Sequence, residues 1–213
     1  MMDRAVGGIL QTLSATYPEA RYYLTFSSPL ELLVAAILSA QVRDEVVNAI
    51  TPALFKKYRS ARDFAEADPA ELEGMVRTVT FYKNKAANIR KACRLLVERH
   101  GGAVPEEMDA LLELPGVARK TANVIQQHAF GRVEGVVVDT HVIRLAQRLG
   151  WTAQKDPAKI ERDLMALLDK GWWDQVPHLL KQHGRAVCRA PVPACSRCVV
   201  AKRCPKAGVS QHT

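Results

Sequence analysis

The chain has 213 residues, 48% of them apolar, so it can bury one full hydrophobic core and divide it between two lobes. Its net charge of +8 predicts attraction to a polyanion, because lysine and arginine near phosphates release condensed counterions. The longest apolar run, Leu32–Leu38, is far shorter than the roughly 20 residues that cross a bilayer, which excludes a membrane-spanning class. No apolar signal segment follows Asp3 and Arg4, so we expect a cytoplasmic protein of bacterial type.

Helix signals recur along the chain, whereas alternating strand patterns are nearly absent, and we predict an all-α fold. The pair Ser28–Pro29 predicts the start of a helix that is apolar almost all round and lies at the centre of a lobe. A long helix is expected at residues 82–100, where two glycines can stop it. Asp68 and Asp156, each followed by proline, predict two further helix starts. Only residues 136–138 look extended.

A tight turn between two helices is predicted in the segment LLELPGVARKTANVI. One helix should end at Leu114 and the next should begin after Pro115–Val117, where Gly116 permits a positive φ. The first amides of the second helix have no intrahelical acceptors and can bind phosphate. Arg119 and Lys120 follow at once, so a DNA backbone held at this turn would lie beside a primary amine. The alternative is a simple connector between helices.

Four cysteines crowd the C-terminal tail: Cys188, Cys195, Cys198 and Cys204, separated by six, two and five residues. Converging thiolates bind soft metals, and so short a segment can wrap one ion or cluster. Spacing alone leaves zinc and iron–sulfur open, although zinc prefers two close cysteine pairs and only one is present. Disulfides are disfavoured in the reducing cytosol that we expect. The segment between the first and last of these cysteines has four basic and no acidic residues, so the shell of the metal is cationic.

The chain also carries short motifs that together match one protein family. They are LSAQ at 38–41, FYKNKAANI at 81–89, LPGVARKTANV at 114–124, VVDTH at 137–141, HGR at 183–185 and the cysteine spacing. Together they resemble the helix–hairpin–helix DNA glycosylases, and among these the endonuclease III family, over nearly the whole chain. The resemblance implies two helical lobes with an active-site cleft between them. One is a central helical barrel domain with the hairpin, at residues 24–134, and the other is a cluster domain of residues 1–23 and 135–213.

The resemblance further implies a [4Fe–4S] cluster, rather than zinc, at the four cysteines, and it assigns catalysis to Lys120 and Asp139. A lysine amine attacks the sugar C1′, expels the base and leaves a Schiff base, which permits β-elimination. Such an amine must be neutral, a form that burial and the positive end of a helix both favour. The Asp139 carboxylate would stabilise positive charge on the sugar or move protons. It is also suited to cap a following helix, and one role does not exclude the other.

Five residues match family positions that contact DNA. Gln41 would hydrogen-bond the orphaned partner base, and Phe81 would fill the gap left by the extruded nucleotide. Their alternatives are a polar residue at a helix end and a core aromatic residue. The hairpin residues Gly116, Ala118 and Arg119 would hold the DNA backbone.

The sequence departs from the usual pattern of the family near these positions. Val42 and Arg43 stand where small or hydroxyl residues are common, Thr80 where glycine is frequent, and Phe81 where leucine is commoner. These differences bear on how the lesion strand is opened. Ala118 stands where glycine is typical, and we expect it to be tolerated if its φ is negative.

The implied function is base-excision repair by a DNA glycosylase that is also an abasic-site lyase. Its expected partner is duplex DNA with damaged pyrimidines or abasic sites, and its expected state is a monomer without membrane attachment. One alternative is a monofunctional mispair glycosylase of the adenine-removing type, which lacks the hairpin lysine. Another is a catalytically weak iron–sulfur DNA-binding module. In the main interpretation, the cysteine tail is a basic DNA-docking loop held by the cluster.

Overall fold

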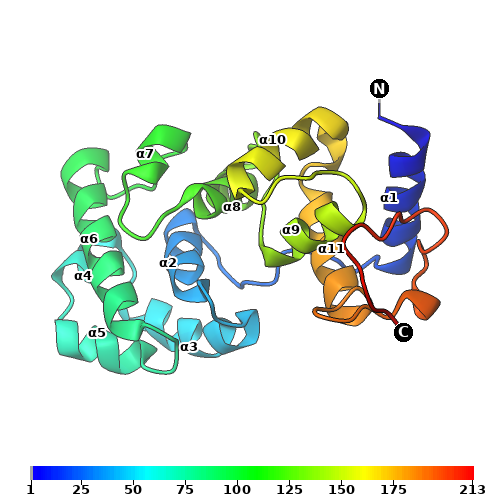
Figure 1. Cartoon of the computed structure of the whole chain (residues 1–213). Helices are drawn as coiled ribbons and strands as arrows, with labels where there is room; N and C mark the ends of the chain where they lie inside the picture. Colours follow the sequence, from blue (N-terminus) through cyan, green and yellow to red (C-terminus); the bar gives the residue numbers. More distant parts are fainter. Residues whose placement is uncertain (1) are drawn as a thin grey trace. The chain divides into compact units, whose positions relative to one another are not determined.

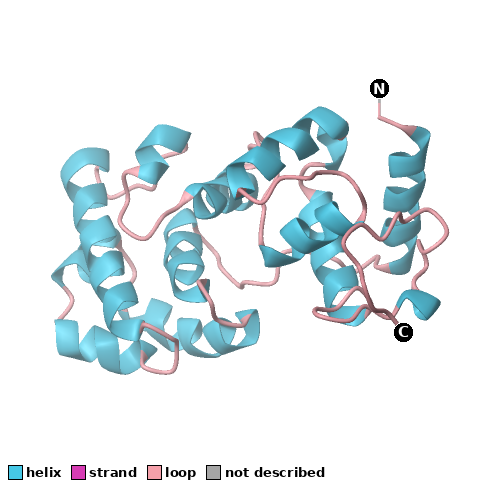
Figure 2. Ribbon diagram, viewed as in Figure 1, coloured by secondary structure: helices cyan, strands magenta, loops and turns pink. Residues whose placement is uncertain are grey.

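The computed structural model describes residues 2–213, and in this part of the chain all regular secondary structure is helical (Figure 2). The all-α prediction is therefore confirmed. Among the described helices, none has the length and hydropathy of a membrane span. The chain forms two compact units, one of Tyr23–Arg132 and one that joins the segment up to Tyr22 with Val133–Thr213.

The unit Tyr23–Arg132 is built around a buried helix (Figure 1). This central helix is α2, whose residues from Leu32 to Leu38 are all buried, and it packs against α3, α6 and α8. Ser28 begins it by accepting a hydrogen bond from the Glu31 amide, and Pro29 occupies the first turn, as the sequence predicted. The helices of this unit are α2 (Pro29–Ser39), α3 (Asp44–Lys57), α4 (Ala61–Glu66), α5 (Pro69–Val76), α6 (Tyr82–His100), α7 (Met108–Leu112) and α8 (Arg119–Phe130).

The long helix α6 has the predicted bounds and ends at Gly101, whose φ is 60°. Its inner face follows helical periodicity, because Ile89, Ala92 and Leu96 are buried at spacings of three and four residues. Lys85 continues that row one turn earlier and is buried as well. A lysine therefore occupies a core position of α6.

The other unit has a second hydrophobic core, to which the cysteine tail belongs. Leu10 of the first helix packs there with Leu145, Leu164 and Leu180, and three of the tail cysteines pack against the same core. Residues 136–138 are buried but form no strand, and they lead directly into α9. The helices of this unit are α1 (Arg4–Thr16), α9 (Thr140–Arg148), α10 (Pro157–Leu167), η1 (Lys170–Trp172), α11 (Gln175–Ala186) and η2 (Cys195–Arg197).

Candidate functional site

The predicted hairpin lies between α7 and α8. Helix α7 ends at Leu112, two residues before the predicted end at Leu114, because a residue that precedes proline is disfavoured in helical conformation. Gly116 has a φ of 87°, as predicted, and a Cβ at this position would lie 3.2 Å from Cβ of Asn88 in α6. Both the backbone angle and the close packing therefore favour glycine at this turn.

Helix α8 starts without a side-chain cap and with two basic residues. Its N-cap, Ala118, makes no side-chain hydrogen bond to the first turn, so that turn receives no capping oxygen from its N-cap residue. The φ of Ala118 is −98°, which meets the condition under which alanine is tolerated here. Arg119 and Lys120 are the first two residues of α8, and both are exposed. Contrary to the burial expected for this amine, Lys120 stands exposed at the positive end of a helix, and only the second of the two expected features is present.

Asp139 is the N-cap of α9 in the other unit. Its Oδ1 accepts hydrogen bonds from the amides of His141 (2.8 Å) and Val142 (2.9 Å), so the predicted capping role is confirmed. Both bonds use the same carboxylate oxygen and leave Oδ2 outside the cap. Nη2 of Arg144 donates to Nδ1 of His141 (3.1 Å), and burial lowers the pKa of His141. Lys120 and Asp139 thus belong to different units.

Gln41 and Phe81 flank the ends of two packed helices, α2 and α6, in the same unit. Both residues have a left-handed backbone, with φ of 57° and 56°. Phe81 is 65% exposed, so the alternative of a core aromatic residue is wrong. Gln41 is exposed too, and its carbonyl accepts a hydrogen bond from Oγ1 of Thr80 at 3.2 Å. The loops that carry the two side chains are therefore in direct contact.

The four tail cysteines line one cavity together with apolar side chains such as Leu145 and Val200. All four are free thiols. Burial raises the pKa of the Cys198 and Cys204 thiols, so their thiolates need a partner such as a metal. The donor set of four thiols in one cavity fits a soft metal ion or an iron–sulfur cluster.

Two arginines of α9 hold the start of the cysteine tail. Arg148 donates to the carbonyls of Cys188 (3.4 Å), Arg189 (2.8 Å) and Pro191 (3.1 Å), and Arg144 also donates to the Cys188 carbonyl (3.2 Å). Nη1 of Arg148 is in addition 3.4 Å from the sulfur of Cys188. The tail is thus fixed to α9 by charged donors that bond backbone carbonyls.

A buried histidine connects the cavity to α1. Nε2 of His183 is 3.4 Å from the Cys198 sulfur, and Nδ1 is 2.9 Å from the hydroxyl of Tyr17. Burial lowers the pKa of His183 to about 4, so the ring is neutral near neutral pH. In the sequence, His183 is visible only as part of the HGR motif, because Tyr17 and Cys198, which it contacts, lie elsewhere in the chain.

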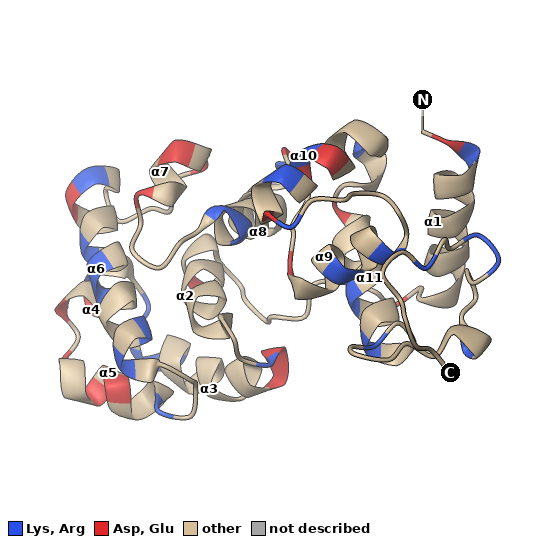
Figure 3. Cartoon of the chain, in the orientation of Figure 1, with Lys and Arg blue, Asp and Glu red and all other residues tan. Residues whose placement is uncertain are grey.

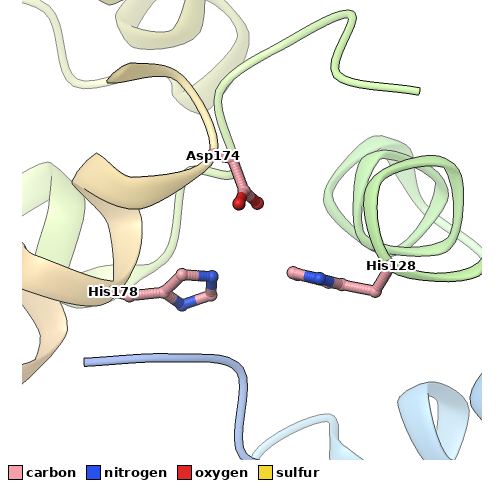
Figure 4. A group of neighbouring side chains, drawn as sticks. All are labelled: His128, Asp174 and His178. Atoms are coloured by element: carbon pink, nitrogen blue, oxygen red, sulfur yellow. The ribbon is translucent and has the colours of Figure 1, made fainter. Parts of the chain in front are cut away.

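Basic residues mark both units (Figure 3). They run along α6 and recur in the tail segment from Cys188 to Cys204, whose net charge is positive. Asp174 and His178 lie one turn apart at the start of α11, where the His178 ring packs against Tyr22 at 6.3 Å between centroids. Figure 4 draws these two side chains together with His128, which belongs to α8 in the other unit. Two ligand types on one helical turn do not complete a metal site by themselves.

Comparison with known proteins agrees with this description. The family model for the HhH-GPD superfamily base excision DNA repair protein matches residues 34–170, and the chain belongs to that superfamily. Within it, the chain belongs to the endonuclease III family. It is 51% identical to endonuclease III of Synechocystis sp. strain PCC 6803 over 95% of this chain and 92% of the relative. It is 40% identical to endonuclease III of Bacillus subtilis over 92% and 89% of the two chains.

Solved structures show the same relationship. A trapped endonuclease III–DNA covalent intermediate, in an estranged-adenine complex, is 38% identical and covers 97% of each chain, with a TM-score of 0.90. A thermostable thymine-DNA glycosylase that is only 20% identical shares the fold, with a TM-score of 0.84 over 95% and 96% of the two chains. The protein is therefore a DNA glycosylase of base-excision repair, and DNA is its partner.

Proposed function

We propose that this glycosylase is bifunctional: it removes oxidised pyrimidines from duplex DNA and then cleaves the abasic site through a Schiff base on Lys120. The main support is the exposed amine of Lys120 in the first turn of an uncapped helix, directly after the hairpin turn at Gly116. A phosphate bound by the first amides of α8 would hold the sugar beside that amine. The trapped covalent intermediate of the relative that is 38% identical is the kind of adduct that an amine nucleophile forms.

The proposed reaction has four steps. Nζ of Lys120 bonds to C1′, and the glycosidic C1′–N bond breaks with its electron pair on the departing base, which takes up a proton. Opening of the sugar ring then gives a C1′=Nζ iminium ion, with the ring oxygen protonated as a hydroxyl group. Loss of a C2′ proton breaks the C3′–O bond and releases the 3′ phosphate, and hydrolysis of the imine restores the lysine. Every step uses the protein's own groups and water.

Asp139 is proposed to assist this chemistry with the carboxylate oxygen that the helix cap does not use. Both capping amides bond Oδ1, so Oδ2 can face positive charge on the sugar or accept a proton. The capping bonds also fix the carboxylate in one orientation, which a freely rotating side chain would lack. Capping and chemistry are then two uses of one residue.

Gln41 and Phe81 are proposed to open the duplex. Their exposure at neighbouring loop positions supports this role, because a polar side chain can bond the orphaned base while a phenyl ring replaces the lost stacking. Gly116, Ala118 and Arg119 would hold the backbone at the hairpin turn.

The four cysteines are proposed to hold a [4Fe–4S] cluster. Their common cavity and its apolar lining support this assignment. When bound, the cluster supplies a covalent cross-link for the tail, and four thiolates leave it no open position for substrate. The bonds from Arg148 and Arg144 would then keep the basic segment in one shape for docking on DNA. Iron and sulfide analysis of the purified protein tests this assignment, and a colourless protein loaded with zinc would contradict it.

Borohydride trapping on a duplex with one abasic site tests the lyase. The wild-type protein should give a covalent adduct. Lys120→Ala and Lys120→Arg should give none, because the first lacks the amine and the second replaces it with a guanidinium that stays protonated. Lys91→Ala, which removes an exposed lysine of α6, is the matched control and should keep the adduct. Base release without any adduct would instead identify a monofunctional glycosylase, and neither release nor adduct would identify a DNA-binding module.

A further inference from the structure

Gln41 and Phe81 share an unusual backbone conformation. Among the described non-glycine residues, only these two and Lys206 have a positive φ. A left-handed L-residue brings its Cβ too close to the backbone, and the conformation persists only where its surroundings hold it. Both side chains are exposed, so their own burial does not provide that hold. The contacts that stabilise the pair must come from neighbouring residues.

The Lys85 side chain holds the segment that leads into Gln41. The residue is only 6% exposed, and Nζ donates to the carbonyls of Leu38 (2.8 Å) and Ala40 (2.6 Å). The Lys85 backbone amide donates to the carbonyl of Phe81 (3.1 Å), which is the ordinary first bond of α6 and does not depend on the side chain at position 85. The Lys85 side chain thus bonds the end of α2 directly before Gln41.

The end of α2 is a favourable place for such a cation. The last carbonyls of a helix have no intrahelical donors and carry partial negative charge, and α2 has no basic residue in its last turn. Burial lowers the pKa of Lys85, and no carboxylate of the described residues contributes to that shift, so carbonyl dipoles are what stabilise the ammonium.

A helix of this kind commonly ends with a left-handed glycine, which needs no outside support. Here the left-handed residue after α2 is Gln41, which has a side chain that DNA can use. Thr80 adds a second tie between the loops, because its hydroxyl donates to the Gln41 carbonyl at 3.2 Å. Glycine adopts a left-handed backbone without strain. At Gln41 the hydrogen bonds from Lys85 and Thr80 stabilise that backbone instead.

We infer that Lys85 is a positioning residue for nucleotide extrusion: its side chain fixes the end of α2 and so Gln41, and the Thr80–Gln41 hydrogen bond ties Gln41 to the loop that carries Phe81. This inference rests on the roles proposed above for those two residues. Lys85 touches neither the sugar nor the base. Loss of the Lys85 ammonium should therefore slow the reaction on a substrate whose base pair must be opened. It should leave the rate unchanged on a substrate that is already single-stranded.

The test compares closed and open substrates for one variant. Lys85→Met keeps the length of the side chain and removes the ammonium. Its matched control is Lys91→Met, which makes the same change at an exposed position of α6. Single-turnover base release is measured on a duplex with thymine glycol opposite 2-aminopurine, whose fluorescence reports opening of the pair. Strand cleavage is measured on a single-stranded oligonucleotide with one abasic site, and circular dichroism gives the folded fraction.

Lys85→Met should slow base release from the duplex by about 100-fold and suppress the fluorescence rise, because misplaced reading groups no longer open the pair. Cleavage of the single strand should change by less than about threefold, and Lys91→Met should match the wild type in both assays. A folded Lys85→Met protein that opens and cleaves the duplex at the wild-type rate would overturn the inference. So would an equal loss on both substrates, which indicates a purely structural lysine.

A second variant covers the case in which Lys85→Met does not fold. Thr80→Val removes one hydroxyl from an exposed position and should slow base release from the duplex alone, by about fivefold. No selective loss in this variant would also count against the inference. Failure of the proposed function has a different signature, because the wild-type protein would then cleave neither substrate.

Discussion

Substitution of Asp139 separates helix capping from chemistry. Asp139→Asn keeps a side-chain oxygen that can accept the bonds that Oδ1 now takes from the amides of His141 (2.8 Å) and Val142 (2.9 Å). Asparagine and aspartate cap helices about equally well, so the loss is the interaction of the charge with the helix dipole, about 0.3–1 kcal/mol. Asp139→Ala removes the acceptor as well and should cost about 2 kcal/mol.

These energies convert into melting temperatures. In a chain of this size, 1 kcal/mol corresponds to about 2–4 °C, so Asp139→Asn should lower Tm by about 1–4 °C and Asp139→Ala by roughly 4–8 °C. Both variants should slow single-turnover base release by about 100-fold or more, because neither retains a carboxylate. Differential scanning fluorimetry and gel-based cleavage measure the two quantities on the same samples.

Asp156→Ala is the matched control, because Asp156 caps α10 in the same unit by accepting a hydrogen bond from the Lys159 amide at 3.0 Å. It should lose about 1 kcal/mol of stability and keep the rate of base release. Two results would refute the reasoning. Full activity in Asp139→Asn would remove the carboxylate from the chemistry, and equal destabilisation by asparagine and alanine would show that the cap does not depend on its acceptor.

Three further outcomes follow from the packing and burial of single residues. Gly184→Ala places a Cβ 2.7 Å from Nδ1 of His141 and should cost about 1–3 kcal/mol in urea unfolding, whereas Gly171→Ala, with open space around it, should stay within about 0.5 kcal/mol. Gly116→Ala forces a side chain to a φ of 87° and should cost about 1–2 kcal/mol and weaken DNA binding in fluorescence anisotropy; unchanged affinity would argue against the hairpin contact. Cys93, whose pKa burial raises to about 12, should resist iodoacetamide at about pH 8 until guanidinium unfolds the protein, and peptide mass mapping that finds it alkylated in the native state would contradict its burial.

The helical class and several helix ends could be predicted from the order of the amino acids alone. Ser28, Asp68 and Asp156 each cap the helix that was predicted to follow them, and α6 has its predicted bounds of Tyr82–His100. Capping and apolar periodicity depend on neighbours within a few residues, so they are visible in the order of amino acids. The turn at Gly116 and the spacing of the tail cysteines are also local features, so they could be recognised in the sequence as well.

Which side chains contact one another could be seen only in the folded protein. The partners of the Lys85 ammonium are carbonyls 47 and 45 residues away, and a lysine within FYKNKAANI looks like any other solvated lysine until α2 and α6 pack together. The left-handed backbone of Gln41 and Phe81 and the exposure of the phenyl ring became evident at the same stage. These features arise from contacts between residues far apart in the chain, which local propensity does not encode.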